Sequence, residues 1–105
     1  MGRRLVRDRA LENWVVPGAE HQVRPVESIE EHVQLLRSKL LEECGEVILA
    51  QSVDELLKEM ADVVTVLEAM ANSAGITWQE VIDMVNQRIG QSGGFVMGMV
   101  WETIR

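Results

Sequence analysis

The chain has 105 residues, of which 47% are hydrophobic and 26% are charged, and its net charge is −7. This length fits one domain spanning 1–105, and the acidic balance disfavours binding to nucleic acid polymers, which require a basic surface. The single cysteine excludes an internal disulfide, and no apolar run approaches the ~20 residues of a membrane span, so we expect a cytoplasmic protein with no signal peptide.

Residues 1–27 are expected to form an arm. Four of the ten basic residues lie in the first nine positions: Arg3, Arg4, Arg7 and Arg9. Residues 15–18 mark a turn, and Pro25 disfavours helix, so residues 21–26 should be extended. The arginines could hold phosphate groups, and the alternative is a solvated N-terminus.

Three helix starts share one capping signature, a Ser or Thr followed three residues later by Glu: Ser28 with Glu31, Ser52 with Glu55, and Thr77 with Glu80. The predicted helices cover 29–51, 53–74 and 78–89. Gly75 and Gly90 are expected to end the second and third helices. We therefore predict an all-α fold, an antiparallel bundle of three main helices in a core spanning 28–90. Because small helical domains often complete their core with another copy, we expect oligomerisation.

Residues 91–105 are rich in glycine and then alternate in polarity. The larger apolar side chains fall on one side: Phe95, Met97, Met99 and Trp101. This pattern predicts an extended tail or a short strand that packs on the helices.

Two acidic pairs at i, i+3 spacing lie inside the first two predicted helices: Glu43 with Glu46, and Glu59 with Asp62. Residues three apart share a helix face, so each like-charged pair destabilises its helix by roughly 0.2–0.5 kcal/mol unless a cation compensates. Position 43 occupies a core slot in the apolar pattern of its helix: Ile29, Val33, Leu36, Leu40, Val47 and Ala50. Glu59 and Asp62 border the expected stripe of the next: Leu56, Met60, Val63, Leu67, Met70 and Ala74.

Carboxylates beside a core need a metal ion or a basic partner, because burying an unpaired charge is costly. If the helices form a hairpin, the two pairs converge; the alternative is a pair of solvated helix faces. An all-oxygen set suits Mg²⁺, with Mn²⁺ possible. His21 and His32 lie outside the pairs, and Cys44 is expected to be a small buried filler.

Several segments together resemble the MazG-like superfamily of all-α nucleoside triphosphate pyrophosphohydrolases. The segments 39–46 and 59–64 are similar to its paired acidic signature, whereas 4–9 and Gly93–Gly94–Phe95 are similar to the two ends of its phosphoribosyl-ATP pyrophosphohydrolase-like branch. Ser92 departs from the arginine usual in that branch.

The resemblance implies a metal-dependent hydrolase that releases a nucleoside monophosphate and pyrophosphate. It implies four Mg²⁺ ligands: Glu43, Glu46, Glu59 and Asp62. One of the carboxylates that bind the metal, or the neighbouring Glu42, would accept the proton of the attacking water, which makes Glu42, Glu43 and Glu46 the candidate catalytic residues. The candidate phosphate-binding residues are Arg7, Arg9, Lys39 and Arg88.

Three functions stay open at this point. The first is a nucleoside triphosphate pyrophosphohydrolase, with removal of noncanonical nucleotides as one role, acting as a homodimer or homotetramer. The second is a noncatalytic regulatory or assembly module whose carboxylates pair with arginines of another chain. The third is a different metal-dependent hydrolase, such as a pyrophosphohydrolase of the phosphoribosyl-ATP type or one that acts on a nucleotide-sugar-like diphosphate. Three tryptophans offer stacking surfaces for a base, although packing is the simpler role: Trp14, Trp78 and Trp101.

Overall fold

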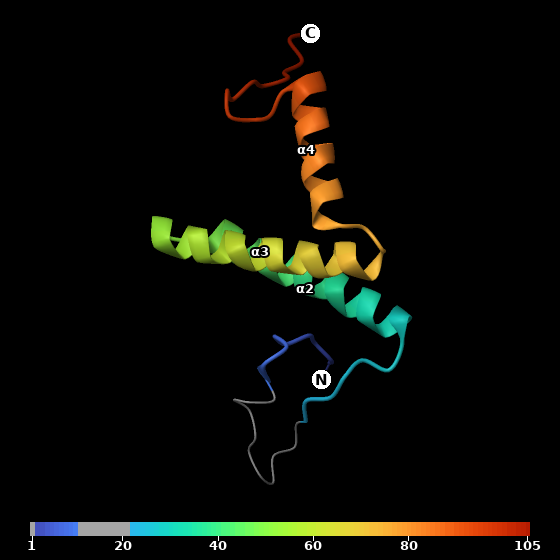
Figure 1. The fold of residues 1–105 in the computed structure, drawn as a ribbon. Helices are drawn as coiled ribbons and strands as arrows, with labels where there is room; N and C mark the ends of the chain where they lie inside the picture. Colours follow the sequence, from blue (N-terminus) through green and yellow to red (C-terminus); the bar gives the residue numbers. More distant parts are fainter. Residues whose placement is uncertain (1, 11–21) are drawn as a thin grey trace.

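The computed structural model describes residues 2–10 and 22–105. Within these residues it contains three α-helices and no β-strand: α2 (Ile29–Leu49), α3 (Val53–Ser73) and α4 (Trp78–Ser92). Helices α2 and α3 pack against each other as an antiparallel hairpin (Figure 1). The all-α prediction is therefore confirmed. None of the described helices is long and apolar enough to cross a bilayer. Trp14, His21 and the expected turn at 15–18 lie outside the described residues.

The helix starts are those that the capping residues predict. At each start the N-cap hydroxyl accepts a hydrogen bond from the third residue of the helix, at 3.0–3.1 Å: Ser28 from Glu31, Ser52 from Glu55 and Thr77 from Glu80. Only Glu80 returns the bond to its N-cap backbone, at 3.4 Å, and completes the capping box. Glu31 and Glu55 instead accept from the backbone N–H of the residue before the cap.

Helix α3 ends at the predicted glycine. Gly75 has a φ of +74°, a conformation that glycine adopts without steric cost. Its N–H donates to the Asn72 carbonyl at 3.1 Å, and the N–H of Ile76 donates to the Ala71 carbonyl at 2.8 Å. This pair of bonds is a Schellman motif, which satisfies the last carbonyls of the helix and turns the chain.

The predicted ends of the other two helices are wrong by a few residues. Helix α4 runs through Gly90 to Ser92, and Gly93, with a φ of +78°, caps it by donating to the Ile89 carbonyl at 2.8 Å. A glycine keeps its N–H, so it can stay in a helix at a cost of about 1 kcal/mol relative to alanine. Helix α2 ends two residues early, at Leu49, because the chain must become extended before the Ser52 cap.

The seam between α2 and α3 holds the small core. Leu36 of α2 and Val66 and Ala71 of α3 are buried, and so is Glu59 of α3. The α2 positions follow the prediction from Val33 to Val47, whereas Ile29, in the first turn, is 74% exposed. On α3, however, the seam is rotated from the expected stripe, because Leu56, Met60 and Leu67 are exposed. Helix α3 has apolar residues around more than half of its circumference, and one partner helix covers only one face.

Helix α4 does not join the hairpin as a third bundle member. It stands away from α2 and α3 (Figure 1), and of its residues only Trp78 and Val81, near its start, are half-buried. The tail after it is bare, with the Phe95 side chain 98% exposed, so the expectation that the tail packs on the helices is wrong for the single chain. The turn at Gly75 directs α4 away from the hairpin, and no residue of α4 or the tail is buried.

Candidate metal and phosphate site

Three of the four predicted ligands meet in the seam of the hairpin. Glu43 comes from α2, and Glu59 and Asp62 come from α3; one carboxylate oxygen of each lies within 4.8 Å of the others. Their side chains are 13%, 11% and 20% exposed, respectively. The antiparallel pairing therefore brings Glu43 of the first acidic pair next to both members of the second pair. Glu46 is exposed and stands outside this group, because three residues turn it about 60° from Glu43.

Three cations face these three carboxylates. The ammonium nitrogen of Lys39 lies 3.4 Å from a carboxylate oxygen of Glu43, and that of Lys58 lies 3.3 Å from Glu59 and 3.8 Å from Asp62. The guanidinium of Arg7 pairs with the other oxygen of Asp62. The hydrogen bond from Lys58 to Glu59, with the charges of Glu59 and Asp62, raises the pKa of Lys58. The cluster is therefore charge-balanced by the chain itself.

The N-terminal arm lies against one side of the hairpin through its arginines. Besides Arg7, Arg3 pairs with Glu31 and Arg4 lies 3.4 Å from Glu42. Arg9, also predicted to bind phosphate, is exposed on the same arm. The basic arm and the acidic hairpin are far apart in sequence, yet they attract each other, so the arm delivers positive charge to the edge of the carboxylate cluster.

Glu31 holds the segment that leads into α2. Its two carboxylate oxygens accept hydrogen bonds from the Arg24 guanidinium at 3.1 and 2.9 Å, and one also accepts from the Glu27 backbone N–H at 2.8 Å. The bond to Arg24 is the main cause that lowers the pKa of Glu31 to about 2, with the Glu27 bond next. The same ion pair raises the pKa of Arg24.

Replacing Arg24 with Gln is expected to raise the pKa of Glu31 from about 2 toward the ordinary value of 4.5. Because the folded pKa is depressed, the native state binds fewer protons than the unfolded state between these values. The contribution to stability is therefore complete above pH 4.5 and is lost as the pH falls toward 2. An NMR titration of the Glu31 carboxyl carbon measures the shift, and Arg37→Gln, on an exposed residue of α2, is the control. A pKa unchanged by Arg24→Gln would contradict the role of this pair.

Of the remaining predicted residues, some adjoin the carboxylate cluster and others lie elsewhere in the structure. Lys39 and Glu42 adjoin the cluster and pair with each other at 3.4 Å. Arg88 lies on α4, and among the described residues no carboxylate is within ion-pair distance of it. Cys44 is exposed, so its prediction as a buried filler is wrong; one position from Glu43 turns it about 100° out of the seam. Trp101 is exposed on the tail and Trp78 is half-buried at the start of α4.

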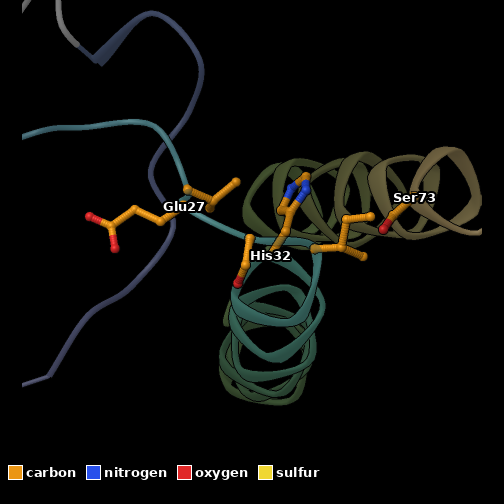
Figure 2. Close-up of a pocket in the computed structure, with 6 residues that line it drawn as sticks. Glu27, His32 and Ser73 are labelled. Carbon is orange, nitrogen blue, oxygen red and sulfur yellow. The ribbon is translucent and has the colours of Figure 1, made fainter.

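A hollow of about 400 Å³ lies where α2 starts and α3 ends. Its lining residues include Glu27, Ser28, His32 and Ser73 (Figure 2). The Glu27 carboxylate points away from the other two labelled side chains (Figure 2). No member of the carboxylate cluster lines this hollow, and His32 lies outside the cluster, as predicted.

The chemistry of the cluster fits a hard divalent cation. Three carboxylates from two helices supply oxygen donors only, which suits Mg²⁺ or Mn²⁺ and is poor for softer metals. Lys58 is the neighbour that sequence reasoning missed. Its position next to Glu59 and four residues before Asp62 was the available signal, since i, i+4 residues are neighbours on a helix surface.

A family model described as phosphoribosyl-ATP pyrophosphohydrolase matches residues 17–89. The match covers well over half of the chain and includes α2, α3, most of α4 and the whole carboxylate cluster. It leaves out the four arginines at the start of the arm and the tail after α4. No curated protein and no solved structure matches the chain.

Proposed function

Because the chain belongs to the phosphoribosyl-ATP pyrophosphohydrolase family, whose members act on phosphoric anhydrides, we propose that it hydrolyses phosphoribosyl-ATP with Mg²⁺. The products are phosphoribosyl-AMP and pyrophosphate, which would place the reaction in histidine biosynthesis. The observation that carries the proposal is the convergence of Glu43, Glu59 and Asp62 within the residues that match the family.

The proposed metal ligands are the three converging carboxylates and Glu46, the exposed fourth member of the predicted set. When bound there, Mg²⁺ neutralises phosphate charge and lowers the pKa of a coordinated water. Three carboxylates are proposed as acceptors of the proton of the attacking water. They are Glu43, Glu46 and Glu42, of which Glu42 adjoins the cluster.

The cations around the cluster are the proposed phosphate contacts. Lys39, Lys58 and Arg7 now pair with carboxylates. With a divalent ion held by the same carboxylates, the ammonium and guanidinium groups would no longer be needed to balance them and would be free to turn to phosphate oxygens. Arg9 and Arg88 are proposed as further contacts; Arg88 stands on α4, away from the hairpin (Figure 1).

A second candidate is a pyrophosphohydrolase for ordinary or noncanonical nucleoside triphosphates. The acidic segments 39–46 and 59–64 favour it, because they resemble the signature of the wider MazG-like superfamily of nucleoside triphosphate pyrophosphohydrolases. The same carboxylates and cations would serve either substrate, since both contain a triphosphate. A cytoplasmic location and assembly as a homodimer or homotetramer belong to the proposal in both cases.

Pyrophosphate release separates the candidates. The full chain is incubated with phosphoribosyl-ATP and with a panel of canonical and modified nucleoside triphosphates, with Mg²⁺, with Mn²⁺, and with chelator. We expect metal-dependent release that is fastest with phosphoribosyl-ATP. Faster release from a nucleoside triphosphate would favour the second candidate. No release from any nucleotide by protein with an intact helical circular dichroism spectrum would favour a noncatalytic module and overturn both.

A further inference from the structure

Lys58 contacts more of the converging carboxylates than either of the other two cations does. Its ammonium nitrogen lies 3.3 Å from an oxygen of Glu59 and 3.8 Å from an oxygen of Asp62. The hydrogen bond to Glu59 and the charges of Glu59 and Asp62 are the main causes that raise the pKa of Lys58, and the charge of Glu43 adds to them. The other two cations each pair with a single member of the cluster. One ammonium group therefore interacts with all three carboxylates.

The Lys58 side chain is free to leave the cluster without disturbing the hairpin. It is 71% exposed, whereas the side chains of Glu43 and Glu59 are 13% and 11% exposed. A lysine ammonium is strongly hydrated and sits on a flexible four-carbon stem, so it can turn into solvent. The carboxylates stay in the seam between the helices. In these ion pairs the cation is therefore the mobile partner.

The Lys58 ammonium also lies against oxygens that a divalent ion needs. It faces one oxygen of Glu59 and one of Asp62, and the Arg7 guanidinium pairs with the other oxygen of Asp62. With a cation at both oxygens of Asp62, an entering ion must displace one of these cations or be repelled by it. Lys58 thus competes with a metal ion for the same ligands.

The balance of charge decides what is able to replace Lys58. The three carboxylates carry three negative charges and the three cations carry three positive charges, so these side chains together are neutral without a metal. A divalent ion that entered alone would leave an excess of positive charge among shielded side chains, where it is costly. A triphosphate carries more negative charge than the ion carries positive charge. An ion that enters with a triphosphate therefore supplies the anion to which the Lys58 ammonium can turn.

We propose that Lys58 makes metal binding conditional on the substrate: it disfavours a divalent ion that arrives alone and accepts one that arrives bound to a triphosphate. Lys58 is a positioning residue in this proposal, because it acts on the metal through Glu59 and Asp62. The inference rests on the proposed function, since it concerns the same carboxylates, and it adds a coupling between the two ligands. By linkage, the triphosphate strengthens metal binding by the same factor by which the metal strengthens triphosphate binding.

Calorimetric titration of the full chain tests the proposal without turnover. The protein is titrated with Mg²⁺ alone and with the preformed Mg²⁺ complex of α,β-methylene-ATP, an analogue that cannot be cleaved between its α and β phosphates. The wild type is expected to bind the complex at least about 10-fold more tightly than Mg²⁺ alone. Lys58→Met should bind Mg²⁺ alone roughly 3- to 10-fold more tightly than the wild type, because a competing ion pair is gone. It should bind the complex more weakly, because a phosphate contact is lost.

Two further variants make these opposite changes specific. Arg37→Met removes a positive charge from an exposed position of α2, about 9 Å along the helix from Glu43, and should change neither affinity. Lys58→Arg keeps the positive charge and should keep the binding of Mg²⁺ alone weak, as in the wild type.

Several results would overturn the inference. They are equal binding of Mg²⁺ alone by the wild type and Lys58→Met, weaker binding of both titrants by Lys58→Met, the same change in Arg37→Met, and tightened Mg²⁺ binding in Lys58→Arg. If Lys58→Met loses its helical circular dichroism spectrum, the wild type decides: Mg²⁺ alone bound as tightly as the complex would refute the coupling. Pyrophosphate release tests the proposed function separately, so its failure and the failure of this inference are distinguishable.

Discussion

Glu59→Gln is expected to abolish most metal-dependent pyrophosphate release while the chain keeps its helical fold. Glu59 is the most buried of the converging carboxylates. As it is a proposed metal ligand, replacing it with a neutral amide removes one negative charge from the set of ligands that bind the metal. Removing a group that only hydrogen-bonds to a metal ligand typically lowers metal affinity or activity by roughly 10- to 100-fold. Loss of a ligand itself should therefore lower kcat/KM by at least about 100-fold. Calorimetric titration with Mg²⁺ should show weaker binding in the same variant.

Two comparisons make this result specific. Glu68→Gln removes an exposed carboxylate from the same helix and should leave both metal affinity and activity near those of the wild type. Glu46→Gln tests the fourth proposed ligand: a loss as large as that of Glu59→Gln places Glu46 in the working set, whereas a small loss restricts the set to the three carboxylates that meet in the seam. Wild-type activity in Glu59→Gln would refute the metal site.

Leu36→Ala should give the largest loss of stability among single substitutions in the hairpin. Leu36 is 3% exposed and is one of only three buried apolar residues in the described part of the chain. Truncating a buried leucine to alanine costs roughly 2–5 kcal/mol, and we expect about 3 kcal/mol in the free energy of unfolding. Urea unfolding followed by circular dichroism measures the change.

All variants must be unfolded at the same protein concentration, because the assembly proposed for this chain would make its apparent stability depend on concentration. Leu49→Ala is the matched control, since it makes the same truncation at an exposed position of α2 and should change the free energy of unfolding by less than about 0.5 kcal/mol. Equal losses in the two variants would show that the seam around Leu36 is not the core of the fold.

Local signals in the sequence determined where the helices start. A hydroxyl and a carboxylate three residues apart need only one turn of chain to make their bonds, so Ser28, Ser52 and Thr77 cap helices in the predicted places. Gly75 likewise ends α3 as predicted, because glycine, which has no Cβ, adopts the positive φ of this position without steric cost. Gly90 misled the prediction, since glycine is also tolerated within a helix and Gly93 could cap instead.

Although Glu46 stays outside the group, the sequence also determined that Glu43 would meet Glu59 and Asp62, because a short connection between two helices favours an antiparallel hairpin. It did not decide which face of α3 would enter the seam. Several faces of α3 are apolar enough, and packing against α2 selected the one with Glu59 and Val66 and left Met60 bare. No local sequence pattern predicts which face of α3 is buried.

Only the tertiary structure decided that Arg7 joins the cations that balance the carboxylates, and in which direction α4 runs. Arg7 reaches Asp62 across 55 positions of sequence, and such a contact depends on the path of the arm rather than on helical spacing. The direction of α4 depends on the turn at Gly75 and on which surface packs against the apolar face of the helix. Capping and helical periodicity involve residues only a few positions apart, so the sequence predicts them correctly. Which apolar face of a helix is buried depends instead on the surfaces that pack against it, and these come from distant parts of the sequence.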